Sequence, residues 1–585
     1  MTFEALIPVP RAVTPLSGQV RVPTGLSVSG GKEAVLDAEW PGWTRGDAVS
    51  IHHEPEGQPE SYQLRLTPDA IRIVHADELG LRHALRSLRQ LAGTTFAAAQ
   101  IDDAPLLPWR GVMLDISRDR VPTQRELERV VDIVADTKGN ALQLYVEHSF
   151  SYHEHHAVWR DASPITGLEL QALDAYAAAR GVSLIANQNC FGHMERWLAE
   201  PAYADLAELP AICDILRAGD PTPKSLCSSD PAALALVTSL LDEQVPCVRS
   251  GMVNIGCDET WDLGEGRSAD AVAARGVGRV FGDYVADVVK HCQSRGWQAQ
   301  FWADMALDHL AAFDRVPAEA LALAWGYEAD SDFERWGEVL CERDRAWWAC
   351  PGTASWRSVY GRPDARDGSI AAAVAAADAF GASGLLVTDW GDCGHRQQWP
   401  VAAVAQVSGL AAAWSGATPA TTTLGEHALG TGGGAAAAWL DELAGLERDV
   451  RASAPHPLRA GPLINAGVVF SDAHLPWGRS DWLPELLPWL ALREQVAALA
   501  AQRPAIDNAL VARELDHTAA VALAYVERAC ARRGGSGDGA AWNARWAEIE
   551  TDFAALWDER CRPGGRADAL RWYQVCGREA RERWA

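Results

Sequence analysis

Eight short apolar segments between residues 109 and 390 constrain the fold of this chain more than any other feature. They are 111–116, 141–147, 183–188, 251–257, 298–304, 320–326, 345–350 and 384–390. Segments of helical character lie between them, for example 123–137, 167–180, 231–243 and 271–294. Strands that alternate with helices predict a parallel sheet of the α/β class, and eight such units predict a closed (β/α)8 barrel, the TIM barrel.

Polar and aromatic residues recur where the predicted strands end. In barrels of this kind the active site is built at the C-terminal ends of the strands, so we expect these side chains to meet on one rim. They are Asp115, Glu147, Asn189, Asp258 with Glu259, Trp302 with Asp304, Trp325 with Tyr327, and Trp390 with Asp392.

The adjacent acids Asp258 and Glu259 are the most informative members of this set. They follow the buried-type segment 251–257 near the middle of the chain. Like charges a few ångströms apart resist joint ionisation, so one acid of such a pair can remain protonated and act as a general acid. A solvated acidic turn is the structural alternative, and the strand-end position argues against it.

The composition excludes several classes of protein. The formal net charge of −26 argues against a nucleic acid or an anionic membrane as partner. No apolar run reaches 18 residues, so we expect no membrane span. The beginning of the chain lacks a secretory pattern, and the 12 cysteines contain no Cys-x-x-Cys pair. We therefore expect a cytoplasmic protein with reduced thiols.

The regions on either side of the barrel differ from it in pattern. Residues 1–107 contain a predicted hairpin at 62–74 and an amphipathic helix at 78–92, which indicate a small α+β domain. We assign 108–420 to the barrel and 421–585 to a helical C-terminal domain. The glycine-rich stretch 424–438 marks either a flexible boundary or the caps of short helices.

Four segments together resemble the signature segments of glycoside hydrolase family 20, the β-N-acetylhexosaminidases. The similarity extends to the small N-terminal domain, and Ile-Gly-Cys-Asp-Glu and Asn-Gln-Asn-Cys-Phe-Gly-His are similar to the intracellular hexosaminidase D-like branch. The four segments are 109–118 (Trp-Arg-Gly-Val-Met-Leu-Asp-Ile-Ser-Arg), 190–197 (Cys-Phe-Gly-His-Met-Glu-Arg-Trp), 254–259 (Asn-Ile-Gly-Cys-Asp-Glu) and 390–392 (Trp-Gly-Asp).

The resemblance implies a retaining hydrolysis that uses no protein nucleophile. In that family the 2-acetamido oxygen of the substrate attacks the anomeric carbon and forms an oxazolinium ion. Glu259 would donate the proton to the glycosidic oxygen and then activate water. Asp258 would orient the acetamide and stabilise the positive charge that develops on it. The implied substrate is a small glycan or glycoconjugate with a terminal N-acetylglucosamine or N-acetylgalactosamine, with no cofactor and no metal.

The resemblance also implies the residues that bind the sugar. Arg110 matches an arginine that binds ring hydroxyls, and an arginine packed at the domain interface is the alternative. Asp115 and Arg118 read instead as a structural ion pair beneath the site. The remaining matches are a histidine near the acid, aromatic residues that line the acetamide and the sugar face, and a carboxylate for the 4- and 6-hydroxyls: His193, Trp302, Trp325, Trp390 and Asp392.

The chain departs from the family pattern at two strands. After the second strand it has Gln143-Leu-Tyr-Val-Glu147-His148, so Glu147 is only a candidate ligand. At the seventh strand the expected Trp-Tyr pair is replaced by Cys350-Pro-Gly-Thr-Ala-Ser-Trp356. Trp356, Tyr360 or a loop residue is then the candidate for holding the acetamide, and Tyr327, at the end of the sixth strand, is a further candidate for binding the substrate.

Two rival functions stay open at this stage. One is a sugar-binding barrel without turnover, and the other is a conventional two-carboxylate glycosidase with Glu147 or Asp304 as nucleophile. The run His153-Glu-His-His156 lacks a second cluster of ligands, so we do not expect a metal there. The sequence does not decide between the two sugar epimers or between a monomer and a homodimer.

Overall fold

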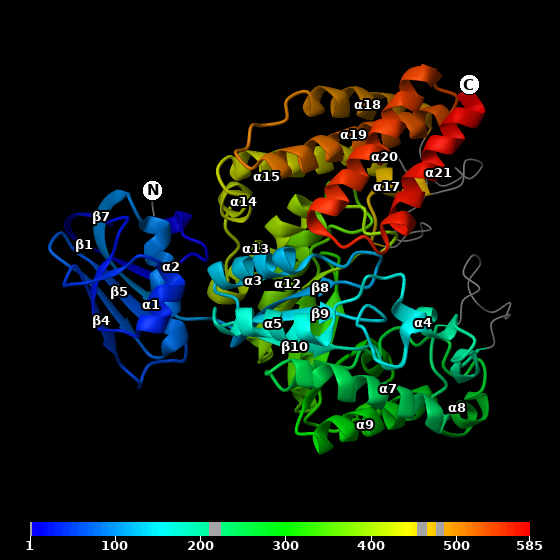
Figure 1. The fold of residues 1–585 in the computed structure, drawn as a ribbon, viewed down its shortest axis with the longest axis horizontal. Helices are drawn as coiled ribbons and strands as arrows, with labels where there is room; N and C mark the ends of the chain where they lie inside the picture. The colour runs from blue at the N-terminus through cyan, green and yellow to red at the C-terminus, as the bar shows by residue number, and fades with distance from the viewer. Residues whose placement is uncertain (1–2, 210–223, 453–464, 475–484, 585) are drawn as a thin grey trace.

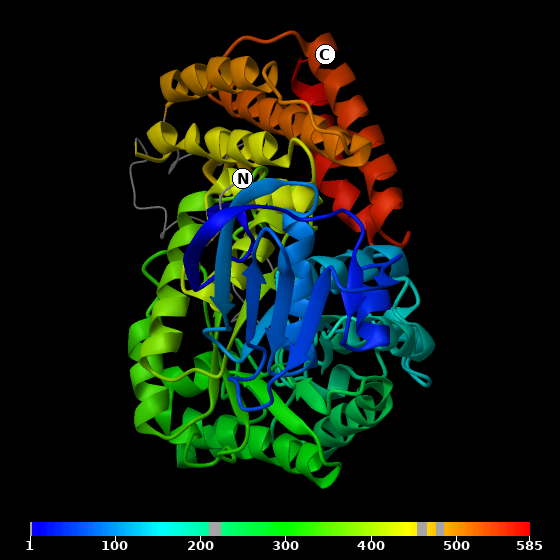
Figure 2. The ribbon, with the colours of Figure 1, turned by 90° about the vertical axis from the view of Figure 1, so that its left-hand side faces the viewer.

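The computed structural model describes residues 3–209, 224–452, 465–474 and 485–584. It consists of an N-terminal sheet domain, a central barrel and a group of C-terminal helices (Figure 1). In the view turned by 90°, the N-terminal sheet lies in front of the barrel and the C-terminal helices lie above it (Figure 2). Within the described ranges, no helix combines the length and the apolar character needed to cross a bilayer.

The N-terminal domain is a seven-stranded sheet in the order β1-β7-β5-β6-β4-β2-β3. The predicted hairpin is formed by β5 and β6, and the predicted helix is α2 (Glu78–Leu91), which begins at Asp77, whose side chain accepts from the N–H of Gly80. The other α-helix of this domain is α1 (Glu33–Glu39), and a short 3₁₀ helix lies at Phe3–Ala5. The strands are β1 (Ala12–Arg21), β2 (Ser27–Ser29), β3 (Thr44–Arg45), β4 (Val49–His53), β5 (Tyr62–Leu66), β6 (Ile71–His75) and β7 (Thr95–Asp103).

All eight predicted barrel strands are present and close into a parallel barrel, so the predicted fold class is confirmed. Almost every strand residue is buried, as expected for parallel strands covered by helices. The strands are β8 (Trp109–Asp115), β9 (Ala141–Tyr145), β10 (Ser183–Asn187), β11 (Met252–Asn254), β12 (Gln298–Trp302), β13 (Leu321–Gly326), β14 (Trp347–Pro351) and β15 (Gly384–Asp389).

Three of the helices that surround the barrel begin at residues with capping side chains. Thr123 caps α3, Thr166 and Glu169 form a capping box at α5, and Asp230 caps α7. The helices between strands are α3 (Gln124–Asp136), α4 (His156–Trp159), α5 (Gly167–Ala178), α6 (Glu195–Leu198), α7 (Pro231–Gln244), α8 (Ala269–Arg275), α9 (Val277–Ser294), α10 (Asp304–Asp308), α11 (Phe333–Glu342), α12 (Pro363–Ala379) and α13 (Trp399–Ser415).

The helix predicted at 271–294 is in fact two helices. Gly276 separates α8 from α9 and has φ +82°, a conformation that ends a helix and that glycine adopts at little cost. The glycine-rich stretch 424–438 likewise divides two helices, with Gly430 and Gly432 at positive φ between α14 and α15. Of the two alternatives for this stretch, helix caps are what the structure shows.

The C-terminal region is helical as predicted. Its helices pack around a hydrophobic core of their own that also takes in residues of α13. They are α14 (Thr421–Leu429), α15 (Gly433–Gly445), α16 (Glu447–Ala452), α17 (Val468–His474), α18 (Leu486–Ala500), α19 (Ala509–Arg532), α20 (Gly539–Arg560) and α21 (Arg566–Trp584).

The turn between α20 and α21 contacts the loop that follows β8. Arg560, the last residue of α20, pairs with Glu126 at 3.0 Å. The backbones of Cys561 and Pro122 form an isolated antiparallel β-bridge. Gly565, at φ +74°, lies so close to Asp119 that a Cβ atom there would be 1.8 Å from the Asp119 carbonyl oxygen. The C-terminal helices therefore support the loop that begins at the C-terminal end of the first barrel strand.

Candidate active site

The turn after β11 presents Asp258 and Glu259 at the C-terminal rim of the barrel. Gly256, Cys257 and Glu259 have φ values of 69°, 77° and 51°, so three of four successive residues lie in the left-handed region. Only glycine fits at position 256, because a Cβ atom there would be 2.3 Å from Oδ1 of Asn189. Such backbone strain is uncommon and is concentrated at functional sites.

His193 connects the two acids. Its Nε2 lies 3.2 Å from Oδ2 of Asp258 and 3.5 Å from Oε2 of Glu259. Burial and Lys224 alone would lower the pKa of His193, but the charge of Asp258 outweighs them and raises it. Burial would likewise raise the pKa of Asp258, yet His193, Lys224 and Arg118 together hold it below its ordinary value. Asp258 is therefore an ionised carboxylate at neutral pH.

One oxygen of Asp258 lacks a partner within the described part of the chain. The side chain is 8% exposed, and its Oδ1 accepts no hydrogen bond from any described residue. A buried carboxylate oxygen without a donor is costly, and in native proteins it usually indicates a missing ligand or water. This oxygen is thus positioned to accept from an N–H group of a bound molecule.

Two other carboxyls of the rim have raised pKa values. Burial and the nearby charge of Asp258 raise the pKa of Asp304 to about 8, and Oδ2 of Asp304 accepts from the backbone N–H of Glu259 at 2.9 Å. Burial raises the pKa of Glu147 to about 7, although Arg118 and His193 oppose the shift. Both groups are therefore largely or partly protonated near neutral pH.

Arg118 lies at the centre of the rim, which the sequence did not predict. It donates to Asp115 at 3.3 Å, so the expected ion pair exists, but it also lies 3.2 Å from Glu147. Its guanidinium group stands over the rings of Tyr145 and Trp390, 4.8 and 5.1 Å from their centroids. Arg118 is therefore a member of the site rather than a support beneath it.

An aromatic cluster fills the barrel mouth beside these charged groups. Trp390 lies 5.9 Å from Trp302 and donates from its indole N–H to the hydroxyl of Tyr327 at 2.9 Å. Tyr327 stacks on Trp325 at 5.0 Å and meets the edge of Trp356, also at 5.0 Å. Five of the predicted aromatic residues thus lie together, and Tyr327 is the one whose hydroxyl lies among them.

Asp392 lies at the edge of the same rim. Its carboxylate pairs with Arg357 at 2.9 Å and is about one quarter exposed. The charge of Asp392 acts on Asp115 and Arg118, which places it on the β8 side of the site. The structure therefore brings together eleven of the predicted residues: Asp258, Glu259, Glu147, His193, Trp302, Asp304, Trp325, Tyr327, Trp356, Trp390 and Asp392.

Arg110 is not in this site, and the prediction that it binds substrate is wrong. It is the second residue of β8, at the opposite end of the barrel, and it is fully buried. Its guanidinium group donates to the carbonyl oxygens of Leu107, Pro108 and Lys138 and pairs with Glu60 of the N-terminal domain. The alternative of an interface arginine is what the structure shows.

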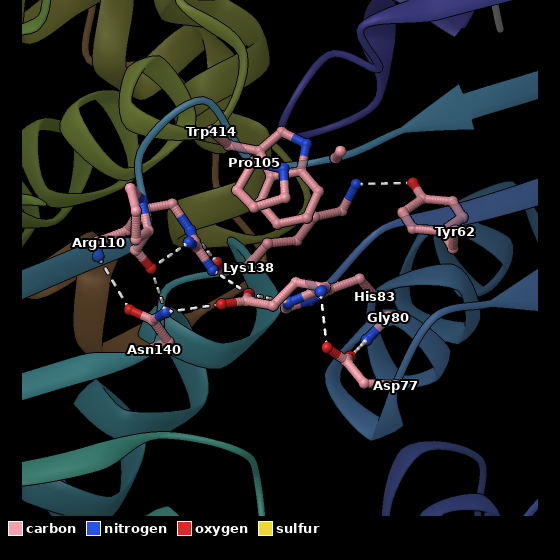
Figure 3. Close-up of polar contacts among 12 residues, drawn as sticks. Tyr62, Asp77, Gly80, His83, Pro105, Arg110, Lys138, Asn140 and Trp414 are labelled. Atoms are coloured by element: carbon pink, nitrogen blue, oxygen red, sulfur yellow. Dashed lines mark hydrogen bonds and ion pairs between the residues drawn. The ribbon is translucent and has the colours of Figure 1, made fainter. Parts of the chain in front are cut away.

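Figure 3 shows Arg110, Lys138 and Asn140 of the barrel facing Tyr62 and His83 of the N-terminal domain, with Trp414 beside them. Lys138 donates to Tyr62 and Asp103, both at 2.8 Å, and Asn140 donates to Glu60 at 3.0 Å. Every one of these contacts joins the two domains. The cluster is a polar seam that fixes the sheet domain to the bottom of the barrel.

Tyr360 is also outside the site. Its hydroxyl donates to Oε1 of Glu447 at 2.6 Å, and its ring belongs to the hydrophobic core of the C-terminal helices. The sequence could not place it, because its partner lies 87 residues further along the chain.

Lys224 and Trp261 border Glu259, and the sequence did not single out either of them. Nζ of Lys224 lies 2.8 Å from Oε2 of Glu259 and 4.6 Å from the centroid of the Trp261 ring. Burial alone would lower the pKa of Lys224, but the carboxylates of Glu259 and Glu195 raise it, so the group is an ammonium ion. Among the described residues, no group of three His, Cys, Asp or Glu side chains is arranged to hold a metal ion.

The fold and this rim define a (β/α)8-barrel protein with the acids and aromatic residues that carbohydrate-active barrels use. Comparison with models of known protein families agrees with this class and identifies one family within it. The model described as "Glycosyl hydrolase family 20, catalytic domain" matches residues 107–338, and "Glycosyl hydrolase family 20, domain 2" matches residues 41–104. The chain belongs to glycosyl hydrolase family 20.

Individual relatives are distant. A β-hexosaminidase of Akkermansia muciniphila is 27% identical over 236 residues, 36% of this chain and 47% of the relative. Hexosaminidase D of Bos taurus is 26% identical over 204 residues, 33% of this chain and 56% of the relative. The matches to the curated relatives thus span about half of their length.

The fold match extends over nearly the whole chain. A chitobiase structure from Flavobacterium johnsoniae superposes with a TM-score of 0.60 at 16% identity, covering 98% of this chain and 100% of that one. The family match on the catalytic domain ends within α11, before β14 and β15. The departure at the seventh strand, β14, lies beyond this match, whereas the departure after the second strand, β9, lies within it.

Proposed function

We propose that this protein is an exo-acting β-N-acetylhexosaminidase that works by substrate-assisted catalysis. The observation that supports this most directly is Oδ1 of Asp258, a buried oxygen of an ionised carboxylate beside Glu259 that has no donor among the described residues. A 2-acetamido group offers the N–H donor that this oxygen lacks. As the acetamide oxygen attacks the anomeric carbon, positive charge develops on that N–H, and the carboxylate stabilises it.

Glu259 is the proposed acid and base of the same reaction. Its side chain is about one quarter exposed, at the outer edge of the pair, where a leaving group departs toward solvent. It gives its proton to the glycosidic oxygen in the first step and takes a proton from water in the second. His193 stands within 3.5 Å of its Oε2, and Asp304 fixes its backbone N–H, so the carboxyl group is held in one position.

Arg118, Trp390 and Asp392 are the proposed ligands of the sugar ring. A rigid guanidinium fork beside an aromatic face and a carboxylate is a suitable set for binding hydroxyl groups and an apolar ring face. Tyr327 is the proposed partner of the acetamide group, because its hydroxyl lies in the aromatic cluster and the charge of Asp258 acts on it.

The conventional two-carboxylate mechanism is less well supported by the same geometry. A nucleophile must be ionised, but the pKa of Asp304 is about 8, and its Oδ2 is bound to the backbone of Glu259. Glu147 accepts from the hydroxyl of Tyr145 at 3.0 Å and pairs with Arg118. Both acids are therefore engaged in holding the site.

The test is hydrolysis of aryl β-glycosides of N-acetylglucosamine, N-acetylgalactosamine, glucose and galactose, with and without a thiazoline mimic of the oxazolinium ion. We expect turnover of the acetamido sugars alone and inhibition by the mimic. Equal cleavage of glucosides would exclude substrate assistance. Binding of the mimic without any turnover would favour the sugar-binding barrel. The ratio of the two acetamido substrates gives the preferred epimer.

We also propose a cytoplasmic location. It is supported by the eleven cysteines of the described ranges, none of which is paired, whereas a secreted protein often uses disulfides. Cys213 lies outside the described residues. Fractionation of producing cells tests the location. Light scattering decides between a monomer and the alternative homodimer.

A further inference from the structure

The solvent side of Glu259 is bordered by a lysine and an exposed tryptophan. Exposure increases outward along the turn: the side chain of Asp258 is 8% exposed, that of Glu259 is 26% exposed, and Trp261 is 53% exposed. Lys224 lies between the last two, in contact with the carboxylate and over the indole ring. Tryptophan is enriched at binding interfaces, because its ring offers a large apolar face together with a polar N–H group.

A leaving group that Glu259 protonates lies next to Lys224 and Trp261. If Glu259 is the acid, the glycosidic oxygen lies within about 2.6–3.2 Å of its carboxyl group. The first atoms of the leaving group then lie beside Oε2, where Lys224 Nζ is 2.8 Å away. The exposed part of the Trp261 ring comes next, and a flat ring can stack on it.

The use of lysine at this position is unusual for this chain. Only four of the 52 lysine and arginine residues are lysines, so arginine is the usual cation of this protein. An ammonium group makes single contacts on a flexible stem, whereas guanidinium binds a carboxylate in a fixed bidentate manner. Lys224 can therefore transfer from one anion to another.

Catalysis removes the closest partner of Lys224. Glu259 must be neutral when it carries the proton that it will donate, and Lys224 is then a largely buried cation without its 2.8 Å contact. Among the described residues near Lys224, His193 remains paired with Asp258, and Asp304 is bound to the backbone of Glu259, so neither of these two takes over the lysine. Glu195 also acts on Lys224, through its charge alone, with no direct contact.

We propose that Trp261 and Lys224 form the leaving-group subsite, and that this subsite prefers a ring with an anionic substituent near the glycosidic bond. The anion, a carboxylate or a sulfate, takes the contact with Lys224 and frees Glu259 to hold its proton. Binding of the anion and protonation of Glu259 then favour each other, as linked equilibria require. This inference rests on the proposed function and specifies its substrate class.

Matched aryl 2-acetamido glycosides provide the test: one with a ring carboxylate, one with a ring sulfate, and the methyl ester of the first as a neutral control. We expect kcat/KM of the natural protein to be about fivefold or more higher for at least one anionic substrate. This preference should weaken as salt screens the ammonium ion. Whichever anion is favoured identifies the substituent.

Substitutions at Lys224 separate charge from shape. Lys224→Met should bring the ratio of anionic to neutral kcat/KM close to one, and Lys224→Arg, which keeps the charge but holds Glu259 more firmly, should keep only part of it. Lys290→Met is the matched control, because Lys290 is 64% exposed on α9 and pairs with Asp287; it should leave the ratio unchanged. Trp261→Ala should raise KM for all three substrates while the charge preference persists.

The pH profile gives a second measurement that a merely structural lysine would not change. In the natural protein the alkaline limb of kcat should lie at higher pH for the anionic substrate than for the ester, and this difference should vanish in Lys224→Met. Turnover with equal kcat/KM for all three substrates would overturn the subsite and leave the proposed function intact. Absence of turnover with every acetamido substrate would overturn both.

Discussion

The backbone N–H of Glu259 donates to Oδ2 of Asp304 over 2.9 Å, and this contact joins the turn after β11 to the first residue of α10, just after β12. Asp304 can accept this hydrogen bond without adding a third negative charge to the site, because burial and Asp258 raise its pKa to about 8. A carboxylic acid that stays neutral at pH 7 can hold a backbone in place beside two other acids. Its role is then that of a positioning residue.

Asp304→Asn should therefore retain most activity at pH 6 to 7. The pKa of Asp304 is higher in the folded protein than in the unfolded chain, so the natural protein loses stability as pH rises from about 4 to about 8. Asparagine does not titrate, and the variant should gain stability relative to the natural protein across that window. Urea unfolding at pH 5 and pH 9 measures this. A gap between the two proteins that is equal at both pH values would contradict the assignment.

Glu259→Gln should affect substrates according to their leaving groups. Alkyl and sugar leaving groups need protonation, and we expect a loss of about 100-fold or more in kcat/KM, within the range of general acid catalysis. An activated aryl glycoside such as a dinitrophenyl derivative departs without a proton and should lose much less. Comparison of kcat/KM across a series of phenols provides the measurement. An equal loss across the series would argue against the role as acid.

Asp258→Asn should damage all substrates alike. The amide cannot supply the negative charge that stabilises the developing oxazolinium ion, and loss of such a preorganised group costs about 100- to 1000-fold in kcat. Its effect should be as large on activated aryl glycosides as on sugars, which separates it from Glu259→Gln. Circular dichroism checks that the variant is folded. Full activity of the variant would exclude electrostatic stabilisation by Asp258.

Arg110→Met and Arg118→Met should give opposite phenotypes. Arg110 is buried against Glu60, and breaking a buried ion pair costs about 3–5 kcal/mol of stability, so the first variant should unfold at lower temperature with KM nearly unchanged. Arg118 contacts Glu147 and stands over Trp390, so the second should raise KM about tenfold or more. Thermal unfolding measures the stability of the two variants, and steady-state kinetics measures their KM. Exchange of the two phenotypes would restore the sequence-based role of Arg110.

Gly565→Ala should reduce activity from a distance. An added Cβ atom would be 1.8 Å from the carbonyl oxygen of Asp119, so the loop that carries Arg118 must move. Gly534→Ala is the matched control, since Gly534 also has a positive φ, +84°, but has open space around it. Both variants should lose about 1 kcal/mol of stability from backbone strain. A fall in kcat/KM of several-fold is expected for Gly565→Ala alone.

The sequence predicted the barrel well because apolar strands and helices alternate along it with little interruption. It also placed most of the rim, since residues such as Glu147, Asp304 and Asp392 directly follow strands. The prediction that Arg110 binds substrate was wrong for a reason that strand geometry explains. Arg110 precedes the apolar stretch of β8, about five residues or 17 Å from Asp115 at roughly 3.3 Å per residue, whereas Arg118 follows that stretch.

Contacts between distant segments lie beyond what local patterns can reveal. Lys224 reaches Glu259 across 35 residues of chain, and no motif marks its position. Tyr360 was a candidate for holding the acetamide, but its hydroxyl donates to Glu447 on α16, a contact that no local pattern predicts. In both cases the packing of a loop or a helix, rather than the periodicity of the sequence, decides where the side chain lies.

The polar seam around Arg110 has a practical consequence for anyone who wishes to engineer this protein. One seven-residue strand, β8, has the seam at its first residues and Asp115, the anchor of Arg118, at its last. Heat tolerance can thus be sought at one end of the barrel and a new leaving-group preference at the other, with little interference between two campaigns of mutagenesis.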